Sequence, residues 1–225
     1  LRTDGDFQCN VDSFTPDGGT LELYGGTDAN LWVILGELHH LNINKSGGDK
    51  SITHKSLRNG ERRAIPRSNT VNLDADLTVN GSLVINGGEF KTHGFGIVNA
   101  ANVYIHDGGV LSAAGPTEIQ LTPGAVFSVT GGGLLKSTGT AGDQVWIKNS
   151  GGYHTFSVKA GGSISAAFTR FHSMNTSGLN IFPGALIDPS YPFSHCEFAN
   201  GQLNGTLLTI DNDQALTING AAFLS

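Results

Sequence analysis

The chain has few charged residues, only two cysteines and no long hydrophobic run. Charged residues make up 14% of its 225 positions, and the net charge of −6 argues against a nucleic-acid partner, which needs clustered Lys and Arg. Cys9 and Cys196 lie too far apart in sequence to indicate a disulfide framework or a metal-ligand pair. No apolar stretch is long enough to cross a bilayer, so membrane insertion is not expected.

Helical periodicity is also missing, because Gly or Pro interrupts each window that might repeat apolar residues at helical spacing. Short runs of alternating apolar residues take its place, and each run stops at a glycine-rich turn. The 32 glycines supply the positive φ angles that such turns require. The runs that show this pattern include 77–79, 83–85, 103–105, 127–129, 145–147, 156–158, 179–181 and 216–218.

This alternation predicts an all-β fold. A period of two residues indicates strands with one buried face, and their regular recurrence indicates a stacked array. We therefore expect a parallel β-helix of about eight to ten turns, each of roughly 20–25 residues in three short strands. An antiparallel β-sandwich is the alternative, because Asn80-Gly81 and Asn204-Gly205 are typical hairpin turns.

Residues 1–225 are expected to form a single β-helix domain cut from a longer chain. Residues 51–70 break the repeat and predict an irregular basic loop or insertion. Cys196 alternates with its neighbours, so a buried free thiol is expected there. Six aromatic residues near the C-terminus are expected to fill a wider section of the core or to close that end: Phe168, Phe171, Phe182, Tyr191, Phe193 and Phe198.

Several segments resemble the degenerate repeats of large secreted bacterial surface proteins, which are adhesin-like and contain right-handed parallel β-helix regions. The segments are FTPDGGTLELYGG, HHLNINKSGG, LDADLTVNGSLVINGGEF and LNGTLLTIDNDQALTI. The resemblance implies a right-handed, single-stranded solenoid and an extracellular or cell-surface location. It says less about activity, because such coils serve as stalks, scaffolds and carbohydrate-active domains.

Two pairs of carboxylates are candidates for catalysis. Asp74 and Asp76, and likewise Asp211 and Asp213, would share one face of a strand about 6.5–7 Å apart at Cα. That spacing suits general acid and base groups, and the second pair also suits a calcium ion. The alternative is that each pair solvates an outer face near a turn. No cofactor is predicted otherwise.

Arg63 and Arg67 are candidates for a second kind of chemistry. The stretch Arg63-Ala64-Ile65-Pro66-Arg67 resembles the Arg-x-Pro-x-x-Arg stretch of pectate lyases, although its second arginine falls one residue early. In that reaction a basic group removes the proton beside the uronate carboxylate. The alternative is a solvated basic loop. The histidines show no metal-ligand spacing, so none is assigned to a metal.

Four aromatic residues are candidates for sugar stacking, with partial burial under loops as the alternative: Trp32, Tyr104, Trp146 and Tyr153. The sequence therefore predicts a non-catalytic structural, carbohydrate-binding or adhesive module of a secreted or cell-surface bacterial protein. Its expected partners are a polysaccharide or cell-surface glycan and other domains of the parent chain. The alternative is a polysaccharide lyase or glycoside hydrolase that acts on an acidic polysaccharide in a groove along the β-helix.

Overall fold

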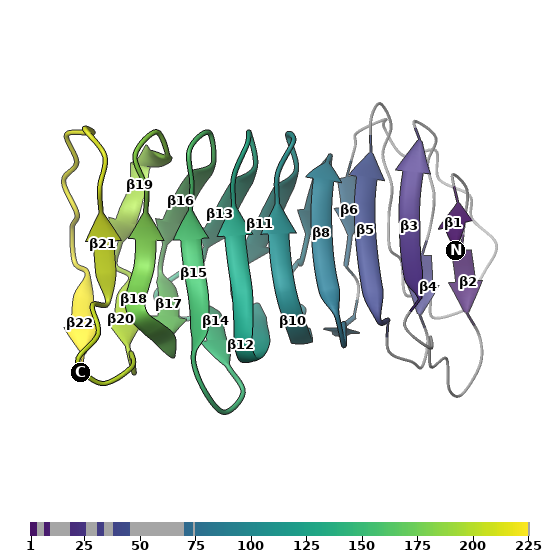
Figure 1. Cartoon of the computed structure of the whole chain (residues 1–225), viewed down its shortest axis with the longest axis horizontal. Helices are drawn as coiled ribbons and strands as arrows, with labels where there is room; N and C mark the ends of the chain where they lie inside the picture. Colours follow the sequence, from purple (N-terminus) through teal and green to yellow (C-terminus); the bar gives the residue numbers. More distant parts are fainter. Residues whose placement is uncertain are drawn as a thin grey trace.

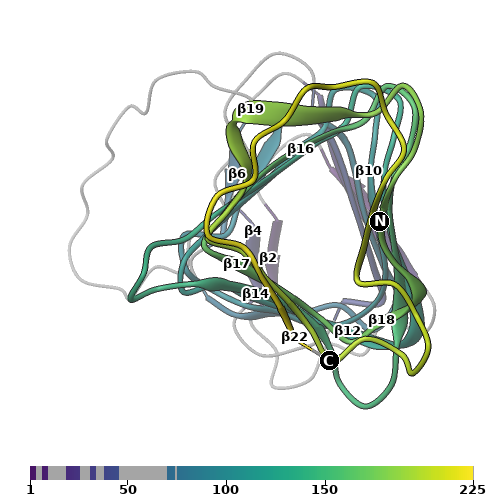
Figure 2. The ribbon, with the colours of Figure 1, turned by 90° about the vertical axis from the view of Figure 1, so that its left-hand side faces the viewer.

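The computed structural model describes residues 1–3, 7–9, 19–25, 31–33, 38–45, 70–73 and 75–224. The strands in this part of the chain wind into an elongated parallel β-helix with three faces (Figure 1). Figure 2 shows its triangular cross-section. All the strand pairs described are parallel, so the predicted β-helix is confirmed and the antiparallel sandwich is wrong. No helix that could span a membrane occurs among these residues.

The first face lies at the front of Figure 1. Its strands are β1 (Arg2–Thr3), β3 (Thr20–Gly25), β5 (His40–Lys45), β8 (Ser82–Gly87), the second part of β10 (Ile97–Ile105), the second part of β12 (Glu118–Val129), β15 (His154–Val158), β18 (Met174–Ile181) and β21 (Leu208–Ile210). β2 (Phe7–Cys9) and β4 (Leu31–Val33) form a separate two-stranded sheet.

The other two faces complete each turn. The second face holds β6 (Thr70–Asn72), β9 (Glu89–Lys91), β11 (Val110–Ala114), β13 (Leu134–Thr138), β16 (Ser163–Ala167) and β19 (Leu186–Ser194). The third face holds β7 (Leu77–Thr78), the first parts of β10 and β12, β14 (Val145–Asn149), β17 (Thr169–His172), β20 (Glu197–Ala199) and β22 (Ala222–Leu224). The strands β10 and β12 bend around a corner and so belong to two faces.

The core consists of ladders of inward side chains, because every second residue of a strand points inside. On the first face, the ladder runs through Leu83, Val103, Phe127, Phe156 and Leu179. On the second it runs through Val71, Phe90, Leu111, Leu135, Ile164 and Ile187. On the third it runs through Ile97, Ile119, Ile147, Phe171 and Phe198. These residues are almost completely buried.

The described residues form about seven turns, slightly below the predicted eight to ten. One turn takes 20 residues between Leu83 and Val103, but another takes 29 between Phe127 and Phe156. The chain therefore makes fewer turns than a uniform short repeat would give. The predicted basic loop at 51–70 lies outside the described residues, apart from Thr70, which begins β6.

Two predictions about individual side chains have different outcomes. Cys196 is buried as expected, and its burial raises the pKa of the thiol to about 12. Phe171, Phe193 and Phe198 pack in the core, also as expected. The other three aromatic residues do not fill the core: Phe168 is partly exposed, and Phe182 and Tyr191 are exposed.

The corners between the first and second faces stack through backbone hydrogen bonds from turn to turn, including Asp107 N to Gly131 O (3.0 Å) and Gly161 N to Gly184 O (2.9 Å). Gly109 ends one such corner. A β-carbon at Gly109 would overlap the carbonyl oxygen of Ile85 and lie 2.7 Å from its carbonyl carbon.

We therefore expect Gly109→Ala to lower the free energy of unfolding by roughly 1–3 kcal/mol, because a rigid backbone neighbour must move. The matched variant Gly142→Ala has no atom near its new β-carbon and should stay within about 0.5 kcal/mol of the wild type. Urea denaturation of both variants measures the difference. Equal stability of the two variants would contradict the close stacking of this corner.

Candidate functional site

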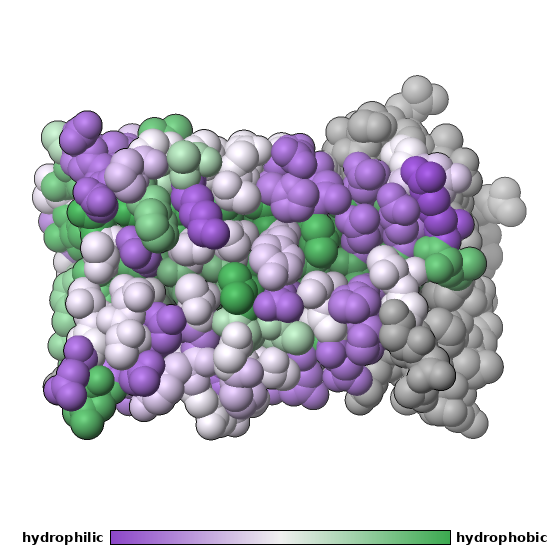
Figure 3. Space-filling model, in the orientation of Figure 1, coloured by the Kyte–Doolittle hydropathy of each residue, from purple (hydrophilic) through white to green (hydrophobic). Residues whose placement is uncertain are grey.

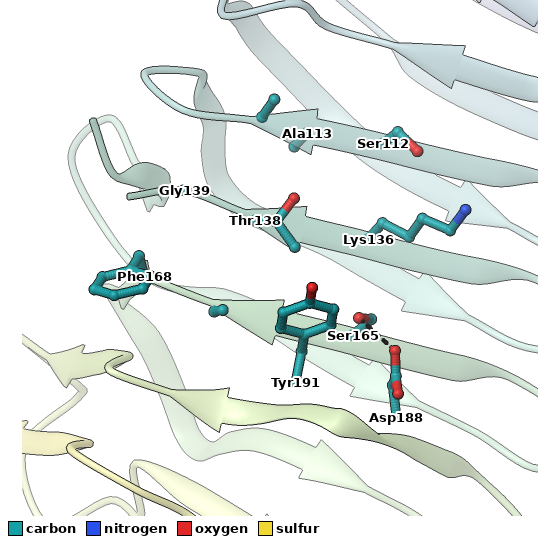
Figure 4. Close-up of a pocket in the computed structure, with 11 residues that line it drawn as sticks. Ser112, Ala113, Lys136, Thr138, Gly139, Ser165, Phe168, Asp188 and Tyr191 are labelled. Carbon is teal, nitrogen blue, oxygen red and sulfur yellow. Dashed lines mark hydrogen bonds between the residues drawn. The ribbon is translucent and has the colours of Figure 1, made fainter. Parts of the chain in front are cut away.

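A pocket of about 460 Å³ opens on the outer side of the second face (Figure 4). Its residues come from four consecutive turns, through β11, β13, β16 and β19. The residues that line it are Ser112, Ala113, Ala114, Lys136, Thr138, Gly139, Ser165, Ala167, Phe168, Asp188 and Tyr191. The floor thus consists mainly of small side chains, and the larger ones stand around it.

Strand register explains the floor. Ser112, Lys136 and Ser165 occupy one row across β11, β13 and β16. Two positions further along the same strands, a second row begins at Ala114 and continues through Thr138 to Ala167. Residues two apart on a strand share a face, so both rows point outward from the core. The two rows form a shallow trough whose surface consists of hydroxyl groups and methyl groups.

The wall at the β19 side comes from a break in register. Ile164 pairs with Ile187, but Ala166 pairs with Pro192, so four residues of β19 stand opposite Ser165 alone. This bulge carries Asp188 and Tyr191 into the pocket lining. Bulges of this kind re-aim side chains and are common beside functional sites. Tyr191 is 47% exposed, and its ring rises over the floor in Figure 4.

Hydrogen bonds hold the bulge. Asp188 accepts the backbone N–H of Ser190 at Oδ1 (2.8 Å) and the hydroxyl of Ser165 at Oδ2 (2.9 Å). The Ser190 N–H is the largest cause that lowers the pKa of Asp188, and the Ser165 hydroxyl adds to it against the effect of burial. The carboxylate is therefore ionised at neutral pH and offers an acceptor at the rim of the pocket.

Phe168 forms another wall in a conformation that bulky residues seldom adopt. Its φ of 48° is in the left-handed region, as is the φ of 53° at His195 in the next turn, so this conformation belongs to a repeated corner of the solenoid. One face of the ring stacks on His195 in the next turn, with centroids 4.8 Å apart and planes 18° apart. The preceding turn has Gly139 at the corresponding position, which lacks a side chain. The second face of Phe168 is therefore directed into the pocket.

Charged groups lie on both sides of Lys136. Lys136 Nζ lies 3.9 Å from Glu89 Oε1 on one side, and Asp188 lines the pocket beyond Ser165 on the other. Burial alone would raise the pKa of Glu89, but the hydroxyl bond from Ser112 and the charge of Lys91 lower it overall. Both carboxylates are ionised at neutral pH. The pocket lining thus presents one ammonium donor, Lys136, and one carboxylate acceptor, Asp188, while Glu89 lies outside the lining and pairs with Lys136 and Lys91.

The three predicted aromatic residues whose side chains are described do not form one site. Trp146 lies on β14 of the third face, Tyr104 on β10 of the first face, and the 41%-exposed Tyr153 in the loop between β14 and β15. The first face is a mosaic of small polar and apolar areas (Figure 3), and Tyr104 is partly buried there. Trp32 belongs to β4, but its side chain lies outside the described part.

Trp146 is engaged by side chains of its own face. The guanidinium of Arg170 lies 4.4 Å from the ring centroid, and Lys148 Nζ lies 5.6 Å from it. Glu197 in turn contacts Arg170 Nε (3.6 Å) and His172 Nε2 (2.6 Å). The cations that contact the indole are already paired or partly buried, so this cluster stabilises the third face and leaves less of the ring for a ligand.

Three of the predicted acidic residues have described positions, and they do not form one site. Asp76 is exposed and accepts the backbone N–H of Gly96 at 2.6 Å. Asp211 and Asp213 are exposed and follow the end of β21 at Ile210, so the expected strand spacing does not apply to them. No group of three potential metal ligands occurs among the described residues. The remaining candidates lie outside these residues: Asp74, Arg63 and Arg67.

Sequence reasoning missed the main residues of this pocket: Lys136, Phe168, Asp188 and Tyr191. One signal was available. The stretch Asp188-Pro189-Ser190-Tyr191-Pro192 interrupts the alternation of apolar residues, and a proline pair within a strand marks a bulge or an edge. Such an irregular segment between regular strands was a candidate for function.

Comparison with known proteins adds no relative from which a function can be transferred. The chain matches no protein-family model, and neither the curated proteins nor the solved structures searched give a significant match. The pocket itself, with its two aromatic walls, its hydroxyl-bearing floor and its charged side chains, is therefore the feature that indicates a function.

Proposed function

We propose that this chain is a non-catalytic carbohydrate-binding module and that the pocket on the second face is its binding site. The observation that carries the proposal is the pair of aromatic side chains, Phe168 and Tyr191, beside a floor of hydroxyl and methyl groups. Sugar rings present apolar C–H faces that stack on aromatic rings, and their hydroxyls bond to short polar side chains. Lys136 and Asp188 add a donor and an acceptor.

The proposal includes the setting of the module. The repeat segments resemble those of large secreted bacterial surface proteins, which supports an extracellular or cell-surface location and an adhesive role. A polysaccharide or cell-surface glycan is the proposed ligand, and further domains of the parent chain are the proposed neighbours. The net charge of −6 and the low share of Lys and Arg favour a glycan over a nucleic acid.

Alanine variants of the two aromatic walls test the proposal. We expect Phe168→Ala and Tyr191→Ala each to weaken glycan binding roughly tenfold, equivalent to about 1.4 kcal/mol. Isothermal titration calorimetry with a panel of plant, algal and host polysaccharides measures the dissociation constants. The matched control is Tyr153→Ala, which removes a similarly exposed tyrosine outside the pocket and should leave the affinity unchanged.

Two outcomes would contradict the proposal. One is the absence of binding to every member of a broad panel. The other is binding that both wall variants retain at full strength, because the glycan would then occupy another surface. Thermal unfolding of each variant, recorded in parallel, separates a lost contact from a lost fold, since Phe168 also stacks on His195.

A polysaccharide lyase or glycoside hydrolase is the alternative, and one observation favours it. Lys136 and Asp188 bring a basic and an acidic group from different turns to one pocket, as acid–base cleavage requires. Incubation of the panel with the chain, with and without calcium, distinguishes the two functions. If the protein is a non-catalytic binding module, the polysaccharides stay intact. If it is an enzyme, new reducing ends or unsaturated uronate appear with the wild type and are absent with Lys136→Gln.

A further inference from the structure

We infer that the pocket recognises the end of a glycan chain and not an internal segment. The inference rests on the proposed carbohydrate-binding function and adds which part of the chain binds. It follows from three features of the second face: the β19 bulge closes one end of the trough, the bulge is anchored from both sides, and the pocket is small.

The bulge blocks the path of a chain along the solenoid axis. The floor rows run across β11, β13 and β16, so a glycan on them extends along that axis. At β19, residues 188–191 stand opposite the single residue Ser165 and project outward. The pocket lining ends with Asp188 and Tyr191 and includes no residue after them. A longer chain would have to rise over the tyrosine ring to continue (Figure 4).

The wall is held in place by neighbours on both sides. Ser165 donates its hydroxyl to Asp188 from the preceding turn. From the following turn, the Gln214 side chain accepts the N–H of Ile187 (2.7 Å) and donates to its carbonyl oxygen (3.0 Å). A side-chain amide thus pairs with both backbone groups of Ile187, next to the start of the bulge. The end of the trough is therefore a fixed surface.

Size and chemistry agree with a terminal segment. A volume of about 460 Å³ lies in the lower part of the range of roughly 300–1,000 Å³ for small-ligand pockets. A terminal sugar also carries one more free hydroxyl than an internal sugar of the same chain. The Asp188 carboxylate and the Tyr191 hydroxyl stand at the wall where that extra group would lie.

Binding stoichiometry tests the inference. The probes are linear cello-, xylo-, manno-, laminari- and galacturono-oligosaccharides of two to six residues, together with their parent polymers, titrated into the wild-type chain. We expect the dissociation constant per chain to change less than threefold beyond four residues, and each polymer chain to take one protein molecule. Several protein molecules per polymer chain, or an affinity that keeps rising with length, would overturn the inference while leaving carbohydrate binding intact.

A shortened bulge supplies the matched variant. Replacement of residues 188–191 by one serine removes the larger of the two register shifts between β16 and β19. Because it also removes Asp188 and Tyr191 from the pocket, the titration uses at least tenfold more protein, and several protein molecules should then bind each polymer chain. If this variant fails to unfold cooperatively, Tyr191→Gly gives the same readout by lowering the wall alone. A variant that stays at one molecule per chain, or that binds no polymer at this concentration, would contradict a wall that acts only as the end of the trough. Absence of binding by the wild type to every probe would overturn both proposals.

Discussion

Replacing Phe156 with alanine lowers the free energy of unfolding by about 3–5 kcal/mol, the range for a large aromatic residue in a close-packed core. Phe156 is 1% exposed. Its ring stacks on Phe127 with centroids 4.3 Å apart, and meets Phe171 edge to face at 5.7 Å. Phe127 lies in the preceding turn and Phe171 on another face, so the ring joins two turns and two faces. Its loss leaves a cavity that these neighbours line.

Urea denaturation followed by circular dichroism measures this effect. The control is Tyr153→Ala in the same turn, where the side chain is 41% exposed and the loss should stay below about 1 kcal/mol. If the two variants lost equal stability, the interior of the solenoid at this level would not be the packed ladder that the structure shows. A solenoid can unfold in parts, so the midpoints of two spectroscopic probes should also be compared.

The second large effect is a loss of stability at acidic pH that depends on His154. This residue begins β15, is 1% exposed and pairs in register with Met174. Neither ring nitrogen has a hydrogen-bond partner among the described residues. Burial disfavours the charged imidazolium and, although the nearby Ser173 backbone acts in the opposite direction, lowers the pKa of His154 from 6.5 to about 4. Folding therefore requires a neutral imidazole at this position.

The sign of the pH effect follows from proton binding. Between pH 6.5 and about 4, the unfolded chain binds a proton at His154 and the folded chain does not, so acid favours unfolding. The full shift corresponds to about 3 kcal/mol lost as the pH falls from 7 to below 4. We expect His154→Leu to lack this component of the pH dependence in denaturation curves. The control His106→Gln should retain it, and a pH profile identical in all three proteins would refute the burial of a neutral histidine.

Much of the fold was predictable because a β-helix repeats one local rule. The segments 83–85, 103–105 and 127–129 alternate at period two, and the structure stacks them in register in one ladder. The glycine-rich ends of these segments form the stacked corners. Local pattern and global fold agree at each turn, so the parallel solenoid could be inferred from strand spacing alone. The number of turns was harder to predict, because the length of the connections between strands varies from turn to turn.

The pocket was much harder to predict, because its residues depart from that rule. Phe168 continues an apolar pattern in sequence, yet a left-handed φ turns its backbone at a corner and leaves the ring beside the pocket. Tyr191 is carried outward by the bulge, which has no effect on composition or periodicity beyond a few residues. Lys136 is one of several lysines with similar surroundings in sequence. Only the register of neighbouring turns brings these side chains together.

For the predicted site residues, the suitable chemistry could be recognised from the sequence, but the position of each residue in the fold could not. Trp146 and Tyr104 have the right chemistry for sugar stacking, but the winding of the chain places them on different faces. Asp211 and Asp213 were paired on the assumption of a regular strand, which ends one residue earlier. In a solenoid, residues close in sequence often diverge, whereas residues about one turn apart converge. Candidate sites are therefore better sought among residues that are separated in sequence by about one turn of the solenoid.

The most direct test of a glycan-binding pocket on the second face is an amide chemical-shift titration of the wild-type chain with the oligosaccharide that binds most tightly in the length series. With the glycan in this pocket, we expect the largest shifts at Thr138, Gly139, Ser165 and Tyr191, and little movement of the Trp146 indole N–H. Shifts that gather instead around Trp146 and its neighbours on the third face would rule out this pocket and move the binding site to that face.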